Sequence, residues 1–366
     1  MNGREQKTEQ GTCHSRDRAE PEEYEGGQTF LWMTEKGNTN TTEHARLLEF
    51  ILSPTNLNTA YRRVRRNKGS GGVDGMDTEE LRTYLQTHLE QLITTLQTGK
   101  YKPQPVRRVE IPKENGKRRQ LGIPTVVDRV IQQAITQQLS PMYERQFSDT
   151  SYGFRPNRNA HQAVMQCQKN ANEGYCYVVD MDLEKFFDQV NQSKLIEVLS
   201  RTIKDGRVVS LIHKYLRAGV VVQKQYEETP MGVPQGGNLS PLLSNIMLNE
   251  LDKELERRGL RFVRYADDCM IFCKSKRAAE RVLVSITKYI ESVLYLKVNA
   301  DKTVVAHIKD VKFLGYGFYF AKDGCRIRLH GKSEEKMKSK IRELTSRSNG
   351  WGNEQRKEKL GQYISG

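Results

Sequence analysis

The stretch RFVRYADDCMIFCKS, residues 261–275, sets two aspartates between two arms rich in β-branched, aromatic and other apolar residues. Each arm is typical of a β-strand, and the short junction predicts a tight hairpin with Asp267 and Asp268 at its tip. Aspartate is common in turns, so the pair by itself is also compatible with an ordinary turn. The stretch constrains the fold because it indicates an antiparallel pair of strands that presents two carboxylates.

A second acidic strand lies in GYCYVVDMDLEKFFDQV, residues 174–190. The apolar run predicts a buried strand that passes into a helix. Asp180 and Asp182 are two residues apart, so in a strand both point to one face. A carboxylate there is costly unless it is paired, protonated or bound to a cation. We therefore expect one of the two at the strand's end beside a positive group. The alternative for Asp182 is a cap for the following helix.

If the two acidic strand ends meet, Asp182, Asp267 and Asp268 form a cluster of three carboxylates. The six cysteines form no CxxC pair, and no Cys and His set has zinc-finger spacing. Hard oxygen ligands select Mg²⁺, or Mn²⁺, rather than zinc. Two such ions can activate an attacking hydroxyl group and stabilise a leaving pyrophosphate, so the cluster predicts a phosphoryl-transfer site.

Composition sets the broad class. The 366 residues carry a formal net charge of +14, which favours a polyanionic partner, and the length suits two or three lobes. The first forty or so residues are rich in polar residues and poor in aliphatic ones, which predicts a flexible arm. No apolar run approaches the roughly twenty residues of a membrane span, and the start lacks a signal-peptide core. We expect a cytoplasmic protein.

Two basic segments are candidates for binding phosphate groups. YRRVRRNKGSGGVDG, residues 61–75, predicts a loop between helices that could hold phosphates through amides and cations; a solvated linker is the alternative. Residues 106–124 predict a β-hairpin whose dense cations an anion would stabilise. The cations of the first segment are Arg62, Arg63, Arg65, Arg66 and Lys68.

Helical periodicity marks further segments. Residues 43–53 are helical by period, and residues 126–147 are helical with a stop expected at Ser140 and Pro141. Residues 78–101 form a helix with a leucine stripe that favours a core position over a partner site. The stripe consists of Leu81, Leu85, Leu89, Leu92 and Leu96.

The acidic segments stand in a series that resembles the palm motifs of reverse transcriptases. The closest resemblance is to the reverse transcriptases, or maturases, encoded by bacterial group II introns. The palm-like segments, in order, are VVDMDLEKFFDQV, TPMGVPQGGNLSPLLSNIMLNELD, RFVRYADDCMIFCKS, LKVNADKT and VKFLGYGF. VRRVEIPKENGKRRQLGIPTVVDRVIQQAI and SYGFRPNRNAHQAV resemble the family's fingers motifs, and AYRRVRRNKGSGGVDG resembles its N-terminal fingers extension.

The resemblance implies an α+β fold of the right-hand polymerase type. The palm would contain an antiparallel sheet flanked by helices, and the largely helical fingers would carry a β-hairpin. The start of a helical thumb would follow, and we expect this thumb to be truncated. The expected divisions are an N-terminal arm at 1–45, fingers at 46–175, palm at 176–320 and the beginning of the thumb at 321–366.

The resemblance also assigns roles by position. The resemblance makes Asp182, Asp267 and Asp268 the catalytic metal ligands, and Asp180 is the alternative to Asp182 as the ligand from the first acidic segment. Phe187 becomes a steric gate that excludes a 2′-hydroxyl group, whereas Phe186 is expected in the core. Gln235 would lie against the incoming nucleotide and template. The remaining roles are triphosphate binding for Lys113 and Arg119, proton donation to pyrophosphate for Lys302, and nucleic-acid contact for Arg155 and the cations of residues 62–68. An ordinary surface position is the alternative for Lys302.

The function implied is an RNA-directed DNA polymerase that uses Mg²⁺, dNTPs, an RNA template and a DNA primer. The family also binds intron RNA, assists its splicing and supports retrohoming. One alternative is an RNA-binding splicing cofactor with little polymerase activity. Another is a retron-type or defence reverse transcriptase, which shares the palm. The oligomeric state stays open.

Overall fold

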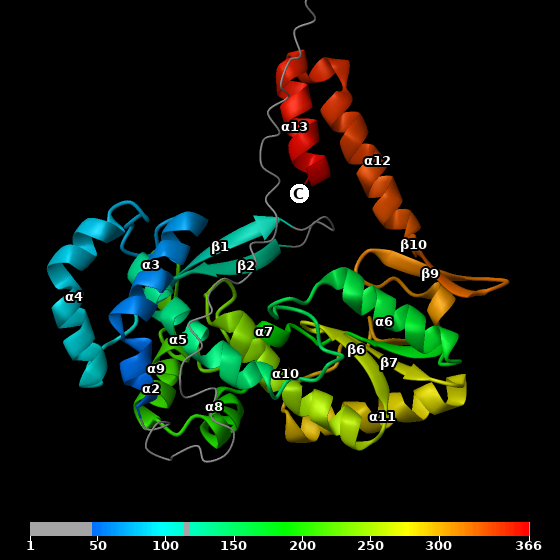
Figure 1. The fold of residues 1–366 in the computed structure, drawn as a ribbon, viewed down its shortest axis with the longest axis horizontal. Helices are drawn as coiled ribbons and strands as arrows, with labels where there is room; N and C mark the ends of the chain where they lie inside the picture. Colours follow the sequence, from blue (N-terminus) through cyan, green and yellow to red (C-terminus); the bar gives the residue numbers. More distant parts are fainter. Residues whose placement is uncertain (1–45, 113–117, 366) are drawn as a thin grey trace, which may run out of the picture. The chain divides into compact units, whose positions relative to one another are not determined.

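The computed structural model describes residues 46–112 and 118–365. The two acidic segments contribute three strands to one four-stranded antiparallel sheet (Figure 1). The strand order is β6-β7-β3-β8, so strands far apart in the sequence lie side by side. The predicted α+β fold with an antiparallel sheet is confirmed. The strands are β3 (Tyr177–Met181), β6 (Arg261–Tyr265), β7 (Asp268–Cys273) and β8 (Val304–His307).

Alternation along these strands divides their side chains between two cores. Val179 and Ile271 belong to a core cluster that includes residues of helix α11 (Lys276–Val293). Val178 and Phe272 belong to a second cluster, which includes residues of helix α6 (Ala160–Asn172). Figure 1 shows α6 and α11 on opposite sides of the sheet. The strands read as continuous apolar runs because both faces are covered.

The helices that precede this sheet are α2 (Leu47–Ile51), α3 (Pro54–Asn67), α4 (Leu81–Gln97) and α5 (Val126–Glu144). The leucine stripe of α4 is only partly in the core: Leu81 and Leu96 are buried, but Leu89 is 38% exposed. The prediction of a loop for the arginines of residues 61–75 is wrong, because they lie in α3. Ala60 and Val64 are buried one helical turn apart, and their packing continues the helix through the basic run.

The predicted stop at Ser140 and Pro141 is also wrong, since α5 continues to Glu144. A proline inside a helix costs about 3 kcal/mol. Leu139 and Tyr143, which flank Pro141, are both buried in the main core. Burial of one large apolar side chain contributes about 1.5–3 kcal/mol, so two such side chains outweigh the proline.

The predicted cationic hairpin is confirmed as β1 (Val106–Pro112) and β2 (Arg118–Ile123), paired antiparallel. It belongs to a second sheet, of order β2-β1-β4-β5, with β4 (Val220–Val222) and β5 (Gln225–Glu227). Its turn, residues 113–117, and the expected arm, residues 1–45, lie outside the described residues. The fingers–palm boundary stays a prediction, because one core cluster contains both Ile131 and Val179.

The remaining elements complete the predicted order. Helix α7 (Phe186–Gln189) follows β3, and α8 (Gln192–Thr202), α9 (Gly206–Leu216) and α10 (Ser240–Arg257) precede β6. The hairpin β9 (Tyr316–Ala321) and β10 (Gly324–Leu329) leads to α12 (Gly331–Thr345) and α13 (Asn353–Ser365), separated by η3 (Arg347–Asn349); η2 (Ile308–Asp310) follows β8. Among the described helices, none has the length and apolar character that a membrane crossing needs.

Candidate active site

Asp182 lies directly after the last residue of β3 and is held by the turn at residues 299–303. Lys302 Nζ lies 3.1 and 3.0 Å from its two carboxylate oxygens, and Asn299 Nδ2 donates to Oδ2 at 2.9 Å. The prediction of an aspartate at the strand's end beside a positive group is therefore confirmed. The capping alternative is wrong, because the residue before α7 is Lys185, with φ of +45°.

The β6–β7 hairpin places the aspartate pair much as predicted. Tyr265 pairs with Asp268 across the strands, so the turn consists of Ala266 and Asp267 alone. Ala266 has φ of +55°, a value that a tight hairpin turn uses at its first central position. Asp267 thus lies at the tip, whereas Asp268 is the first residue of β7.

Strand register brings the acidic ends together. Met181 of β3 pairs with Cys269 of β7, so Asp182 and Asp268, the next residues toward that end of the sheet, lie on neighbouring strands. Loss of hydration, and then the charges of Asp267 and Asp182, raise the pKa of Asp268 to about 6. Within the described ranges, no three Asp, Glu, His or Cys side chains are grouped as a metal site. Asp267 and Asp182 are nevertheless close enough to Asp268 for their charges to act on it.

Asp180 is the fourth carboxylate of this group. It lies within β3, where it pairs with Met270 and Val304. Burial, followed by the charges of Asp268 and Asp182, raises its pKa to about 6. Its place inside the sheet contrasts with that of Asp182 at the strand's end.

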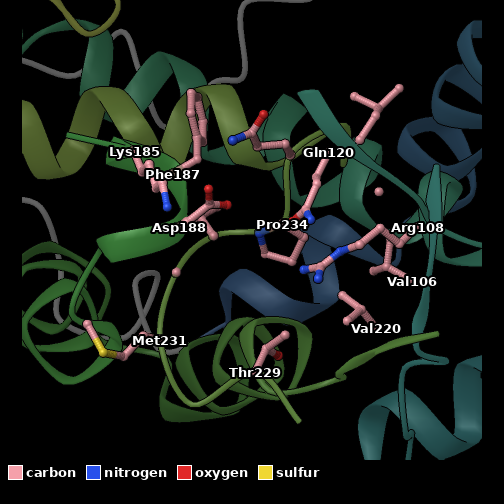
Figure 2. A pocket seen from close by; sticks show the side chains of 15 residues that line it. Val106, Arg108, Gln120, Lys185, Phe187, Asp188, Val220, Thr229, Met231 and Pro234 are labelled. Atoms are coloured by element: carbon pink, nitrogen blue, oxygen red, sulfur yellow. The ribbon is translucent and has the colours of Figure 1, made fainter. Parts of the chain in front are cut away.

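A pocket of about 280 Å³ contains two of the predicted nucleotide-binding residues, Phe187 and Gln235. Its lining comes from β1, β2, the α7 region and the loop at residues 229–235. Figure 2 shows the guanidinium group of Arg108 pointing into this pocket, with Lys185 near Phe187. Phe186, by contrast, is buried in the core, as expected.

The glycine-rich loop is bound to the cationic hairpin through its backbone. Gly122 N of β2 donates to Gln235 O at 2.6 Å. Gly236 has φ of +105°, and a Cβ there would lie 2.3 Å from Gly122 O. A side chain at this position would therefore force the loop away from the strand.

Where the structure describes their side chains, the basic residues predicted to bind phosphate groups are not among those that line the Phe187–Gln235 pocket. Lys113 lies outside the described residues, and Arg119 pairs with Ile111 across the hairpin. Of the cations at residues 62–68, the four arginines lie in α3 and Lys68 is the residue after it. Arg65 forms an ion pair with Glu79 at 3.0 Å. No residue of α3 lines the pocket that contains Phe187 and Gln235.

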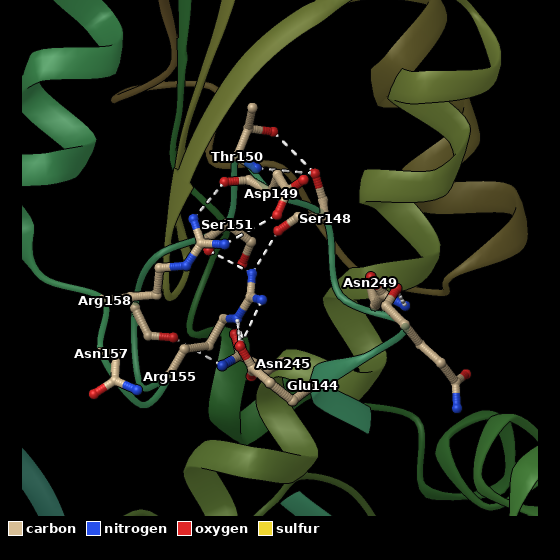
Figure 3. A network of polar contacts seen from close by, with 12 residues as sticks. Glu144, Ser148, Asp149, Thr150, Ser151, Arg155, Asn157, Arg158, Asn245 and Asn249 are labelled. Carbon is tan, nitrogen blue, oxygen red and sulfur yellow. Dashed lines mark hydrogen bonds and ion pairs between the residues drawn. The ribbon is translucent and has the colours of Figure 1, made fainter. Parts of the chain in front are cut away.

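The structure argues against the predicted nucleic-acid contact of Arg155. Its side chain is only 3% exposed and donates to Glu144 at 2.7 Å, and its Nη1 donates to the carbonyls of Ser148 and Ser151 (Figure 3). The guanidinium group therefore supports the loop at residues 148–155 and has almost no surface for a ligand. Sequence alone did not indicate this, because the carboxylate partner, Glu144, lies on α5 and the other acceptors are backbone carbonyl groups.

Several neighbours of the site were missed by sequence reasoning. Asn299 contacts Asp182 and stands in LKVNADKT, where polar residues beside Lys302 were a usable signal. Arg108 and Lys185 line the pocket, yet their sequence surroundings give no hint of it. Arg264 is a charged residue within an apolar strand segment, RFVRY, and a charge in that setting indicates a buried ion pair.

Comparison with known proteins defines the class. Residues 111–318 match the family described as reverse transcriptase (RNA-dependent DNA polymerase). The match covers more than half of the chain and includes β3, the β6–β7 hairpin, Phe187 and Gln235. The chain belongs to the reverse transcriptase family.

Individual relatives place it within that family. Protein YkfC of Escherichia coli (strain K12) is 35% identical over an alignment 312 positions long, and the match covers 74% of this chain and 82% of that protein. Group II intron-encoded protein LtrA of Lactococcus lactis subsp. cremoris is 30% identical over an alignment 357 positions long, and the match covers 80% of this chain but 59% of LtrA. Within the family, the chain is similar to the reverse transcriptases that group II introns encode. Among solved structures, the partial Cas6-RT-Cas1--Cas2 complex is similar with a TM-score of 0.43 and 27% identity, covering 67% of this chain and 42% of that one.

Proposed function

We propose that the chain adds dNTPs to a primer 3′-hydroxyl group on an RNA template. The observation that carries this is the pairing of Met181 with Cys269, which sets Asp182 beside Asp268 at one end of the sheet. Phe187 and Gln235 share a pocket next to the strand-to-helix connection that begins at Asp182. Carboxylates beside a nucleotide-sized pocket are the parts that a nucleotidyl transfer requires.

Asp182, Asp267 and Asp268 are the residues that would hold divalent ions. They offer only oxygen donors, which suit Mg²⁺ and, as a substitute, Mn²⁺. Loss of hydration, and then the charges of Asp267 and Asp182, raise the pKa of Asp268, and a bound divalent cation would favour its charged form. When bound, such ions supply charge stabilisation for the reacting phosphate.

The protein's own groups orient the substrate. The Phe187 ring excludes a 2′-hydroxyl group by volume, and Gln235 supports the nucleotide against the template. Lys113 and Arg119 bind the triphosphate from the hairpin that the Gly122–Gln235 bond ties to the pocket. Lys302, already 3.0 Å from Asp182, gives a proton to the departing pyrophosphate.

Intron RNA is the second proposed partner. The cations of residues 62–68 lie along α3 and its C-terminal end, and all but the half-buried Arg63 are exposed, so they offer positive charge to a phosphate backbone. Assistance in splicing, and retrohoming with a DNA target, would use this surface together with the polymerase site. A splicing cofactor without polymerase activity, or a retron-type enzyme, are the competing functions.

Primer extension on poly(rA)/oligo(dT) tests the proposal. We expect Mg²⁺-dependent incorporation by the wild type, and its loss in Asp267→Ala and Asp268→Ala. Asp310→Ala, an exposed aspartate outside the site, is the control and keeps activity. Unchanged incorporation in the first two variants would exclude the catalytic assignment. Intron RNA binding without any incorporation by the wild type would favour the splicing cofactor.

A further inference from the structure

The catalytic hairpin rests on a buried arginine. Arg264, the residue before Tyr265 on β6, is fully buried. Its guanidinium group donates to Asp252 at 2.8 and 2.6 Å and to Asn245 Oδ1 at 2.9 Å. Its remaining hydrogen bond, at 2.9 Å, goes to the carbonyl oxygen of Ala266 in the turn. One side chain therefore joins α10, which carries Asp252 and Asn245, to the backbone beside Asp267.

A second segment packs directly against the same turn. The backbone N–H of Arg264 donates to Thr150 O at 2.9 Å, and its carbonyl oxygen accepts from Tyr152 N at 2.8 Å. Asn245 Nδ2 donates to Gly153 O at 2.8 Å, so Asn245 connects Arg264 to this segment. A Cβ on Gly153 would lie 2.2 Å from Ala266 N. The loop at residues 150–153 thus leaves no space behind the turn.

The turn needs this support for two reasons. Ala266 adopts a positive φ that non-glycine residues avoid, and such a conformation persists only where its surroundings over-determine it. The turn also gathers like charges, because Asp267 and Asp268 are adjacent and Asp268 lies beside Asp182 across the β3–β7 pairing. The Arg264–Asp252 pair is neutral as a whole, so it can hold the Ala266 carbonyl without adding a net charge beneath the carboxylates.

We propose that Arg264, Asp252 and Asn245 are positioning residues of the polymerase site. By holding the Ala266 carbonyl, they set the direction in which Asp267 and Asp268 point. The inference rests on the proposed function for its catalytic consequence, although the structural consequence can be measured separately. None of the three is proposed to touch substrate.

The test removes both charges together. Arg264→Met/Asp252→Leu leaves no unpaired buried charge, and such replacements are often neutral for stability. Gly153→Ala pushes the turn from the other side without altering the ion pair. Leu255→Ala is the matched control, since Leu255 is fully buried on the same helix and makes no hydrogen bond to the turn. Each variant is assayed as the full chain on poly(rA)/oligo(dT), with rates corrected for the folded fraction.

For the double variant and Gly153→Ala, kcat is expected to fall about 10- to 100-fold, while KM for dTTP and primer–template affinity stay within about threefold. Leu255→Ala is expected to keep its kcat. Mn²⁺ affinity, followed by electron paramagnetic resonance, should weaken in the first two variants only. Equal kcat and equal Mn²⁺ affinity in all variants would overturn the proposal.

Hydrogen exchange of residues 261–273 separates this inference from the function itself. The double variant should exchange faster than Leu255→Ala in this segment if Arg264 holds the turn. If the wild type proves inactive as a polymerase, the proposed function fails, and exchange alone decides the positioning role. Unchanged exchange in the double variant would overturn it.

Discussion

Replacement of Lys302 by methionine separates two roles that this side chain could have. Its Nζ lies 3.0 Å from Asp182 Oδ2, and the lysine side chain is 65% exposed. Exposed ion pairs contribute about 0.2–1 kcal/mol, so the free energy of unfolding should fall by less than about 1 kcal/mol. A general acid contributes about 10²- to 10⁴-fold in rate. If Lys302 donates the proton to pyrophosphate, Lys302→Met should therefore lose far more activity than stability.

The assay is single-nucleotide incorporation at saturating dTTP, with urea unfolding of the same protein. Lys297→Met is a close control, because Lys297 pairs with Glu184 at 2.9 Å and is 63% exposed. Both variants remove one exposed ion pair near the end of β3, but only Lys302 contacts Asp182. We expect a loss of at least about 10²-fold for Lys302→Met and less than about threefold for Lys297→Met. Equal rates for the two variants would show that Lys302 has no role beyond its ion pair.

Three further predictions follow from the pocket, the core and the basic helix. Phe187→Ala should incorporate ribonucleotides nearly as well as deoxynucleotides, and full discrimination in competition assays would contradict the gate. Asp128→Ala should lower the free energy of unfolding by about 2–4 kcal/mol, since it leaves the buried hydroxyl group of Tyr101, 2.7 Å from Asp128, without its acceptor. Burial also raises the pKa of Asp128, so the wild type should lose stability relative to Asp128→Asn as the pH rises above the unfolded-state pKa of about 4. A difference in unfolding free energy between the two proteins that does not change with pH in urea titrations would contradict this. Arg62→Glu and Lys68→Glu should each weaken intron RNA binding and reduce the slope of log binding constant against log salt concentration by about one. An unaltered slope in filter-binding assays would exclude contact between these residues and the RNA.

Local patterns were sufficient for much of the fold. The two hairpins at residues 106–123 and 261–273, the buried strand before Asp182 and the α4 helix follow from alternation and periodicity within one segment. Two local rules failed where distant packing opposed them. The arginine run became helical because Ala60 and Val64 are buried, and α5 passes through Pro141 because Leu139 and Tyr143 are buried.

The residue types of the site and their order along the chain can be read from the sequence, because carboxylates, glycines and strand patterns are recognisable without a partner. Which of these residues meet depends on tertiary packing. The β3–β7 register sets Asp182 beside Asp268, and the turn after residue 298 brings Lys302 to Asp182. The apolar strand around Arg264 indicates that its charge is buried, but it does not name the carboxylate that pairs with it. Arg155 pairs with Glu144 and Arg264 with Asp252, each more than ten residues away along the chain, and no local pattern identifies such a partner.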